Sequence, residues 1–228
     1  MHFCLLSANK WNLYYCFFIY FIKFSFTSIV IQHLDININK NATLQELGIE
    51  KYFPKIVCFV GKLTNFKGVD VLLDAVSLYE NNETLTLIAG DGELRSTLEE
   101  QCKKLCLKNV VFLGNQPQNI LKKIYNIADC SVVPSRREPF GLVAAEALIC
   151  GAPVVATNQG GLPDFVTPDV GILVNVDDSQ ALAGAIKSIL NKEKSFDRLK
   201  SATKIKTLYS QDSLINQFES LYIKSINK

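Results

Sequence analysis

Short apolar runs alternate with longer segments in which apolar residues recur at helical spacing, from residue 55 to residue 190. Apolar runs bounded by glycine, proline or polar residues are typical of buried strands, and a period of about 3.6 is typical of helices that bury one face. The predicted strands are Lys55–Val60, Thr84–Ala89, Val110–Leu113, Cys130–Val133, Pro153–Ala156 and Gly171–Val174. The predicted helices are Val69–Tyr79, Glu93–Leu105, Ile120–Ile127, Gly141–Cys150 and Gln180–Leu190, the last capped by Ser179. This alternation predicts an α/β fold with a doubly wound, Rossmann-like parallel sheet.

The first 34 residues differ from the rest, because Trp11–Ile31 is almost wholly apolar and aromatic with one lysine, Lys23, inside it. A transmembrane helix needs about 20 apolar residues, which this stretch nearly supplies. The sequence leaves three alternatives open: a membrane anchor, the remnant of a truncated preceding domain, or an ordinary strand or helix.

A short helix is predicted after a polar linker at residues 37–41, with Thr43 as N-cap, Glu46 at its third position and Gly48 ending it. A boundary near Pro54 follows. We therefore expect an N-terminal segment over residues 1–53, the Rossmann-like domain over 54–192 and C-terminal helices over 193–228. The apolar stripe of those last helices is Leu214, Phe218, Leu221 and Tyr222.

Charge and cysteine usage exclude some classes of protein. The formal net charge of +2 gives no basic footprint for nucleic acid. The 7 cysteines lack C-x-x-C spacing and the only histidines are His2 and His33, so we expect no zinc site. Cys58, Cys130 and Cys150 lie in apolar runs and are predicted to be small buried hydrophobes. Reduced thiols favour a cytoplasmic location, with membrane association through residues 11–31 as an alternative.

Two glutamates lie eight positions apart in the stretch Pro134–Leu148. Glu138 lies in a loop after a predicted strand, and Glu146 lies inside an apolar helical run that Gly141 opens. Burying Glu146 among apolar neighbours is costly unless a polar group meets it, and a ligand hydroxyl is one such partner. The helix N-terminus beside Glu138 favours an anion, so the stretch predicts an anionic ligand that carries hydroxyl groups.

Two other loops follow predicted strands and should lie at the same edge of the sheet. The turn Gly61–Gly68 carries Lys62 and Lys67, which can both reach one diphosphate, although its spacing is not that of a P-loop. The pair Gly160-Gly161 allows close backbone approach to a ligand. A dinucleotide fingerprint at Gly90-Asp91-Gly92 would need a third glycine where Arg95 stands, which argues against NAD.

The stretch Pro134–Leu148 resembles the E-x7-E signature of retaining glycosyltransferases with two Rossmann-like domains, the GT-B type. The likeness is to the broad family that includes sucrose and glycogen synthases and many bacterial glycosyltransferases, and it covers Ile56–Leu190, that family's C-terminal, donor-binding domain. Lys67 matches the family's lysine. Lys62 stands where the family normally has arginine, and Asp164 where it more often has glutamate. A lysine at position 62 keeps the charge but loses the bidentate fork of a guanidinium.

The resemblance implies transfer of a sugar from a nucleotide diphosphate sugar to an acceptor with retention of configuration. It assigns Lys62 and Lys67 to the diphosphate, where they would stabilise charge on the leaving group, and Glu138 to the donor sugar. These three form the expected catalytic group. The resemblance also assigns Glu146 to the ribose hydroxyls. Further donor contacts are expected at Gly61, at Gln116 in the loop near the base, and at the backbone N–H groups of Phe140, Gly141 and Leu142, which would support the sugar or phosphate.

A complete enzyme of this type has a preceding acceptor domain of ordinary domain length, and residues 1–53 are too few to supply it. We therefore expect the acceptor domain to be largely absent, in a truncated or two-chain enzyme whose partner chain supplies that domain. The alternative is a non-catalytic nucleotide-sugar-binding module. No cofactor and no metal is expected, because two lysines and a helix N-terminus can neutralise the diphosphate. The acceptor, base and sugar are left open.

Overall fold

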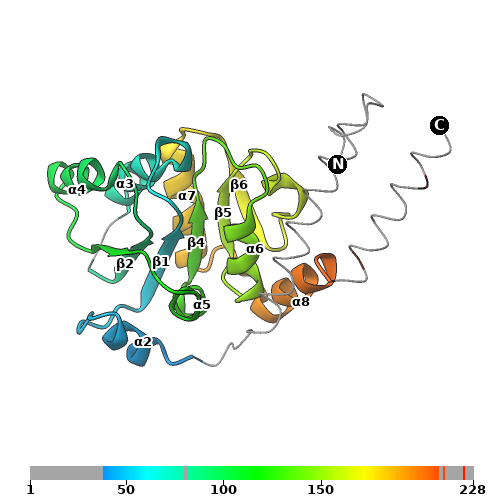
Figure 1. The fold of residues 1–228 in the computed structure, drawn as a ribbon. Helices are drawn as coiled ribbons and strands as arrows, with labels where there is room; N and C mark the ends of the chain where they lie inside the picture. The colour runs from blue at the N-terminus through cyan, green and yellow to red at the C-terminus, as the bar shows by residue number, and fades with distance from the viewer. Residues whose placement is uncertain (1–37, 80–81, 211–212, 214–222, 224–228) are drawn as a thin grey trace.

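Six parallel strands form one sheet in the computed structural model, which describes residues 38–79, 82–210, 213 and 223 (Figure 1). The strand order is β3-β2-β1-β4-β5-β6. The strands are β1 Lys55–Val60, β2 Thr84–Ala89, β3 Val110–Gly114, β4 Cys130–Val133, β5 Val154–Thr157 and β6 Gly171–Val174. The predicted α/β, Rossmann-like class is confirmed. The order reverses between β1 and β4, and in such sheets ligands bind beyond the carboxyl ends of the strands at this reversal.

Helices cover both faces of the sheet (Figure 1). They are α2 Lys40–Glu46, α3 Val69–Ser77, α4 Arg95–Lys104, α5 Gln118–Ile127, α6 Leu142–Ile149, α7 Ser179–Leu190 and α8 Arg198–Leu208, with 3-10 turns η2 Asn65–Lys67 and η3 Leu162–Asp164. Ile56 and Cys58 of β1 pack into the apolar cluster of α2, α5, α6 and α8. Val57 and Phe59 point the other way, into the cluster of α3, α4 and α7. Because successive side chains of a strand face opposite ways, an unbroken apolar run fills two cores.

Two helix starts differ from the prediction. Asn39, not Thr43, caps α2: its side chain accepts from the Ala42 N–H at 3.1 Å, and Thr43 is a helical residue whose hydroxyl donates to the Asn39 carbonyl. Asp178, not Ser179, caps α7 by accepting from the Ala181 N–H at 2.8 Å. In both cases the N-cap is the polar residue further upstream, whose non-helical backbone and side-chain oxygen suit a cap, while the later residue completes the first turn.

Residues before Pro54 pack against the sheet domain. Leu44 of α2 and Phe53 are 1% and 4% exposed and belong to the core cluster of α5 and α6. Glu46 of α2 forms an ion pair with Lys123 of α5 at 2.6 Å. The polar linker predicted at residues 37–41 is thus partly helical, since α2 begins at Lys40. The apolar stretch 11–31 and the stripe within residues 214–222 lie outside the described residues. Within the described part of the chain, no helix is both long and apolar enough to cross a membrane.

Candidate donor-binding site

The loops that follow β1 and β4 contact each other directly through their backbones. The N–H groups of Arg136 and Arg137 donate to the Phe66 carbonyl at 2.8 and 3.3 Å. Gly68, with φ +64°, passes so close to β4 that a Cβ at this position would lie 2.1 Å from the Pro134 carbonyl oxygen. Only glycine combines this positive φ with this close approach. The two loops therefore meet at the reversal of strand order.

Lys67 and Glu138 form an ion pair where these loops meet. The Lys67 Nζ lies 2.7 Å from Glu138 Oε2, which also accepts from the Ser135 hydroxyl at 3.2 Å. The other oxygen, Oε1, accepts from the Gly141 N–H at 3.2 Å. The Glu138 side chain is 7% exposed. A buried carboxylate is tolerated when it is paired and hydrogen-bonded in this way. Three of the predicted site residues are thus brought together.

The loop after β5 supports the backbone of Glu138. The Gly161 N–H donates to the Glu138 carbonyl at 3.2 Å. A Cβ on Gly160, with φ +53°, would lie 1.7 Å from that same carbonyl oxygen. The sequence predicted close backbone approach to a ligand here. In the structure, the glycines allow close approach to the loop that carries Glu138.

Gly141, predicted as the first residue of this helix, is instead the N-cap of α6 and adopts φ +72°. A Cβ here would lie 2.7 Å from Leu162 Cδ2, so the position tolerates no larger residue without displacement. Phe140 and Leu142, on either side of it, are half-buried. The Gly141 N–H is already bonded to Glu138, so of the three amides predicted to meet a ligand, this one serves to hold a side chain.

Glu146 lies within α6, about 7.5 Å along the helix axis from Gly141 at 1.5 Å per residue. It is half-buried, and the hydroxyl of Tyr125 on α5 donates to its Oε2 at 3.0 Å. Burial raises the pKa of Glu146, while hydrogen bonds from Tyr125 and Gln118 act in the opposite direction. We expected a ligand hydroxyl as the polar partner, whereas the structure supplies a protein hydroxyl. No sequence pattern indicated this role for Tyr125, which is 2% exposed on the apolar face of its helix.

The other predicted residues surround this centre. Lys62 is exposed, and no residue in the described ranges forms an ion pair with it. Gly61 follows β1, and its N–H donates to the Ala89 carbonyl at 3.0 Å. The side chain of Gln116 is turned back onto its own strand, where it donates to the Leu113 carbonyl at 2.6 Å. The ligand roles of all these residues stay predictions.

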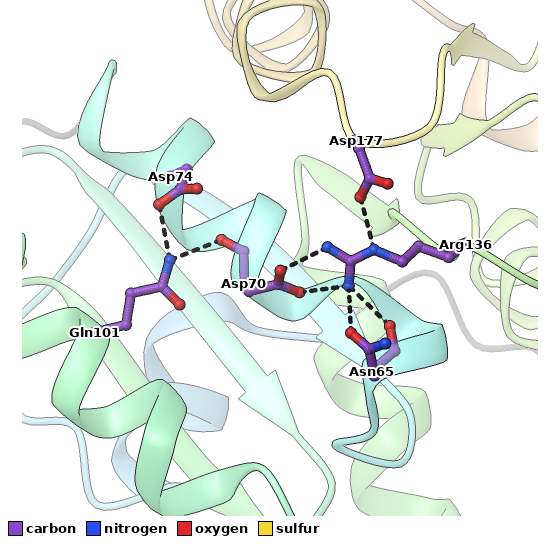
Figure 2. Close-up of polar contacts among 6 residues, drawn as sticks. All are labelled: Asn65, Asp70, Asp74, Gln101, Arg136 and Asp177. Atoms are coloured by element: carbon purple, nitrogen blue, oxygen red, sulfur yellow. Dashed lines mark hydrogen bonds and ion pairs between the residues drawn. The ribbon is translucent and has the colours of Figure 1, made fainter.

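Arg136 was not singled out from the sequence, yet its side chain contacts residues of α3, of η2 and of the loop before α7 (Figure 2). Its guanidinium bonds Asp70 of α3, Asn65 of η2 and Asp177 of the loop between β6 and α7. Each partner is at least 41 residues from Arg136 in the sequence, so no local spacing or periodicity points to these contacts.

Cys58, Cys130 and Cys150 are free and buried, as predicted, and burial raises the pKa of Cys58 to about 12. Across residues 38–79 and 82–210, no three histidine, cysteine, aspartate or glutamate side chains are grouped so as to hold a metal ion.

Comparison with known proteins identifies the family. Residues 45–206 match the family described as Glycosyl transferases group 1. The chain is 34% identical over 193 residues to the D-inositol 3-phosphate glycosyltransferase of Corynebacterium glutamicum, covering 80% of this chain and 46% of that protein. It is 39% identical over 140 residues to an uncharacterized glycosyltransferase of Methanocaldococcus jannaschii, covering 60% of this chain and 36% of that one. The chain thus spans less than half the length of these curated relatives.

Solved structures share the fold. Sucrose-phosphate synthase from Thermosynechococcus elongatus is 29% identical with a TM-score of 0.66, covering 81% of this chain and 48% of that one. Anabaena HepE, solved in complex with UDP and glucose, is 25% identical with a TM-score of 0.66, covering 86% of this chain and 55% of that one. Together with the match over residues 45–206, these likenesses confirm the resemblance predicted from the sequence: the chain belongs to the group 1 glycosyl transferases.

Proposed function

We propose that this chain binds a nucleotide diphosphate sugar at the carboxyl ends of β1 and β4 and is the donor-binding, C-terminal half of a retaining glycosyltransferase. Lys62 and Lys67 bind the diphosphate, Glu138 meets the donor sugar, and Glu146 accepts from the ribose hydroxyls. The N–H groups of Phe140 and Leu142, at the start of α6, provide further donors to the sugar or phosphate.

The observation that carries the proposal is the Lys67–Glu138 pair, with its 2.7 Å separation at the reversal of strand order. It puts a cation for the diphosphate beside a carboxylate that can accept from sugar hydroxyls, with the N-terminus of α6 adjacent. Within the described residues, Glu138 Oε1 accepts from one donor, the Gly141 N–H, which leaves acceptor capacity for a ligand hydroxyl.

We propose a uridine diphosphate sugar as the donor, because HepE is solved with UDP and with UDP-glucose. Leaving-group charge in such a transfer builds on the diphosphate, where Lys62 and Lys67 would stabilise it. No metal is needed for this step, since the two lysines and the helix N-terminus supply the positive charge.

The acceptor is proposed to be bound by a separate domain, from a partner chain or from a longer form of this protein, because the chain spans less than half of its curated relatives. A non-catalytic nucleotide-sugar-binding module is the second candidate. Such a module would need only the donor site at the carboxyl ends of β1 and β4 and no bound acceptor.

A transfer assay separates the two candidates. The chain is incubated with labelled UDP-glucose, alone and with cell extract supplying acceptors and partner chains, and the product is examined by NMR for the configuration at its anomeric carbon. Transfer with the donor's own configuration, abolished by Glu138→Gln, supports the enzyme. Donor binding without transfer in any mixture supports the module, and an inverted product contradicts retention.

A further inference from the structure

The guanidinium of Arg136 makes five polar contacts with three separate segments (Figure 2). Its Nη1 and Nη2 form a two-point contact with the Asp70 carboxylate at 2.9 and 2.6 Å. Nη1 also donates to the carbonyl and side-chain oxygens of Asn65 at 2.8 and 3.1 Å. Nε donates to Asp177 at 2.7 Å. This geometry needs the planar fork of arginine, which a lysine ammonium cannot reproduce.

Two of the residues that Arg136 contacts, Asn65 and Asp70, lie on either side of Lys67 in the sequence. Asn65 belongs to the same 3-10 turn as Lys67, and Asp70 lies in the first turn of α3, three residues after Lys67. Arg136 itself lies two residues before Glu138, and its own N–H donates to the Phe66 carbonyl at 2.8 Å. One side chain therefore connects both flanks of Lys67 to the loop that presents Glu138.

The network extends beyond these loops on both sides. Gln101 of α4 donates to the Asp70 carbonyl at 3.0 Å and to the Asp74 carboxylate at 2.7 Å, which fixes the start of α3 from its other side (Figure 2). Through Asp177, which has φ +59°, Arg136 also contacts the loop between β6 and α7. Asp70 and Asp177 are 39% and 55% exposed, so water screens these ion pairs and they add little to stability. Their main effect is on where the loops lie.

We propose that Arg136 is a positioning residue for the diphosphate of the donor, which holds Lys67 against Glu138 and ties this pair to the Asp177 loop. The proposal rests on the proposed function, because it assigns a role within the same site. Arg136 need not touch the ligand. It fixes the ammonium of Lys67 before the diphosphate arrives, so that binding does not have to order the loop.

The test compares UDP with uridine, since only UDP carries the diphosphate. Affinities are measured by calorimetry for UDP and by NMR titration for uridine. Arg136→Lys is expected to weaken UDP about tenfold and uridine by less than about twofold. A general loss of structure would weaken both ligands alike. In a Lys67→Ala background, Arg136→Lys should change the UDP affinity by less than about twofold, because the group it positions is gone.

Arg198→Lys is the matched control. Arg198 binds the Asn126 and Ala128 carbonyls at 2.6 and 3.3 Å, just before β4, whereas Arg136 lies just after it. Its substitution should leave the UDP affinity of the folded protein unchanged. Asp177→Asn removes one exposed contact of Arg136 and is expected to weaken UDP in the same direction by about threefold, whether or not Arg136→Lys folds.

The outcomes separate this proposal from the one on which it rests. Wild-type protein that binds neither UDP, GDP nor ADP would contradict the proposed function and this role with it. Wild-type binding of UDP with unchanged affinity in Arg136→Lys and Asp177→Asn, or equal losses for UDP and uridine, would overturn the role of Arg136 alone.

Discussion

Lys67 and Glu138 lie 71 residues apart in the sequence, and their charged groups are 2.7 Å apart in the fold. Glu138 is buried and Lys67 is 25% exposed, so the ammonium is the part of the pair that an incoming anion can reach. A diphosphate that draws Lys67 towards itself would free an oxygen of Glu138 for a sugar hydroxyl. The diphosphate would then pair with Lys67 and the sugar with Glu138. One ion pair within the protein would be exchanged for two contacts with the donor.

Lys67→Ala should lower the free energy of unfolding by about 1–3 kcal/mol, because Glu138 keeps its bonds from Ser135 and Gly141 but loses its cation. Urea unfolding of the ligand-free protein measures this. Lys62→Ala is the matched control: Lys62 is exposed and its removal should change stability by no more than about 0.5 kcal/mol. Equal stability of the two variants would show that the pair does not form in solution. Replacing Glu138 by glutamine in the Lys67→Ala background should restore part of the loss.

Lys62→Ala should instead weaken UDP binding, by about 1–3 kcal/mol and less at high salt, because an exposed cation on this loop loses its contact with the diphosphate. Calorimetric titration at two ionic strengths measures both effects. Lys62→Arg should bind UDP at least as tightly as wild type, since a guanidinium can bind a phosphate at two points. If Lys62→Ala binds UDP as wild type does, the lysine is only a solvated loop residue.

Affinity for UDP-glucose should fall on acidification, and Glu146 should be the cause. Burial raises the pKa of Glu146 above its ordinary value, and only the ionised carboxylate can accept from both ribose hydroxyls. The contact is therefore present above this pKa and lost as the pH falls through it. UDP-glucose is the right probe because its diphosphate diester has no proton that titrates near neutral pH. Titrations of wild type and Glu146→Gln with UDP-glucose, at a series of pH values from neutral downwards, measure the effect. A Glu146→Gln variant with the same pH profile as wild type would rule Glu146 out.

The stability of the ligand-free protein should change with pH in the opposite direction to the affinity for UDP-glucose. A carboxyl whose pKa is higher in the folded than in the unfolded state stabilises the fold when protonated, and this contribution is lost as the pH rises through the folded-state pKa. Wild type should therefore gain stability relative to Glu146→Gln as the pH is lowered from neutral. Urea midpoints of both proteins over the same range check this, and parallel curves would contradict it.

Gly160→Ala should destabilise the protein by about 2–4 kcal/mol, because the added Cβ would lie 1.7 Å from the Glu138 carbonyl oxygen at a positive φ. Gly184→Ala, within α7, is the matched control. Nothing lies within 4 Å of its added Cβ, so this change should stabilise by about 0.5–1 kcal/mol. Thermal or urea unfolding compares the two, and similar effects would contradict the packing of the β5 loop on the Glu138 loop.

Local sequence patterns were enough to locate the six strands, although not to give their order in the sheet. Lys55–Val60 and Thr84–Ala89 match β1 and β2 in both bounds, because a buried parallel strand is an unbroken apolar run with clear polar ends. The first residues of the helices were harder to predict. Asn39 and Thr43, or Asp178 and Ser179, are all competent N-caps, and backbone conformation decides between them.

The candidate site was predictable only in part. Lys67, Glu138 and Gly141 each follow a strand, so their common edge follows from topology. Their pairing does not, because it depends on the approach of Gly68 to Pro134 and of Gly160 to Glu138. Tyr125 and Arg136 were not predicted as site residues, for a related reason. A tyrosine on an apolar helix face looks like core, and an arginine in a loop looks solvated, until the fold brings Glu146 and Asp70 to them.

Calorimetric titration of the purified chain with UDP, GDP and ADP, with Glu146→Ala beside it, tests the proposed donor site most directly. We expect UDP to bind selectively and Glu146→Ala to weaken it by about 1–3 kcal/mol, through loss of the charge-assisted bonds to the ribose. Selective binding of GDP or ADP with the same loss would keep the site and change the base. Binding that is equal in wild type and Glu146→Ala, or no binding of any of the three, would contradict a donor site at the carboxyl ends of β1 and β4.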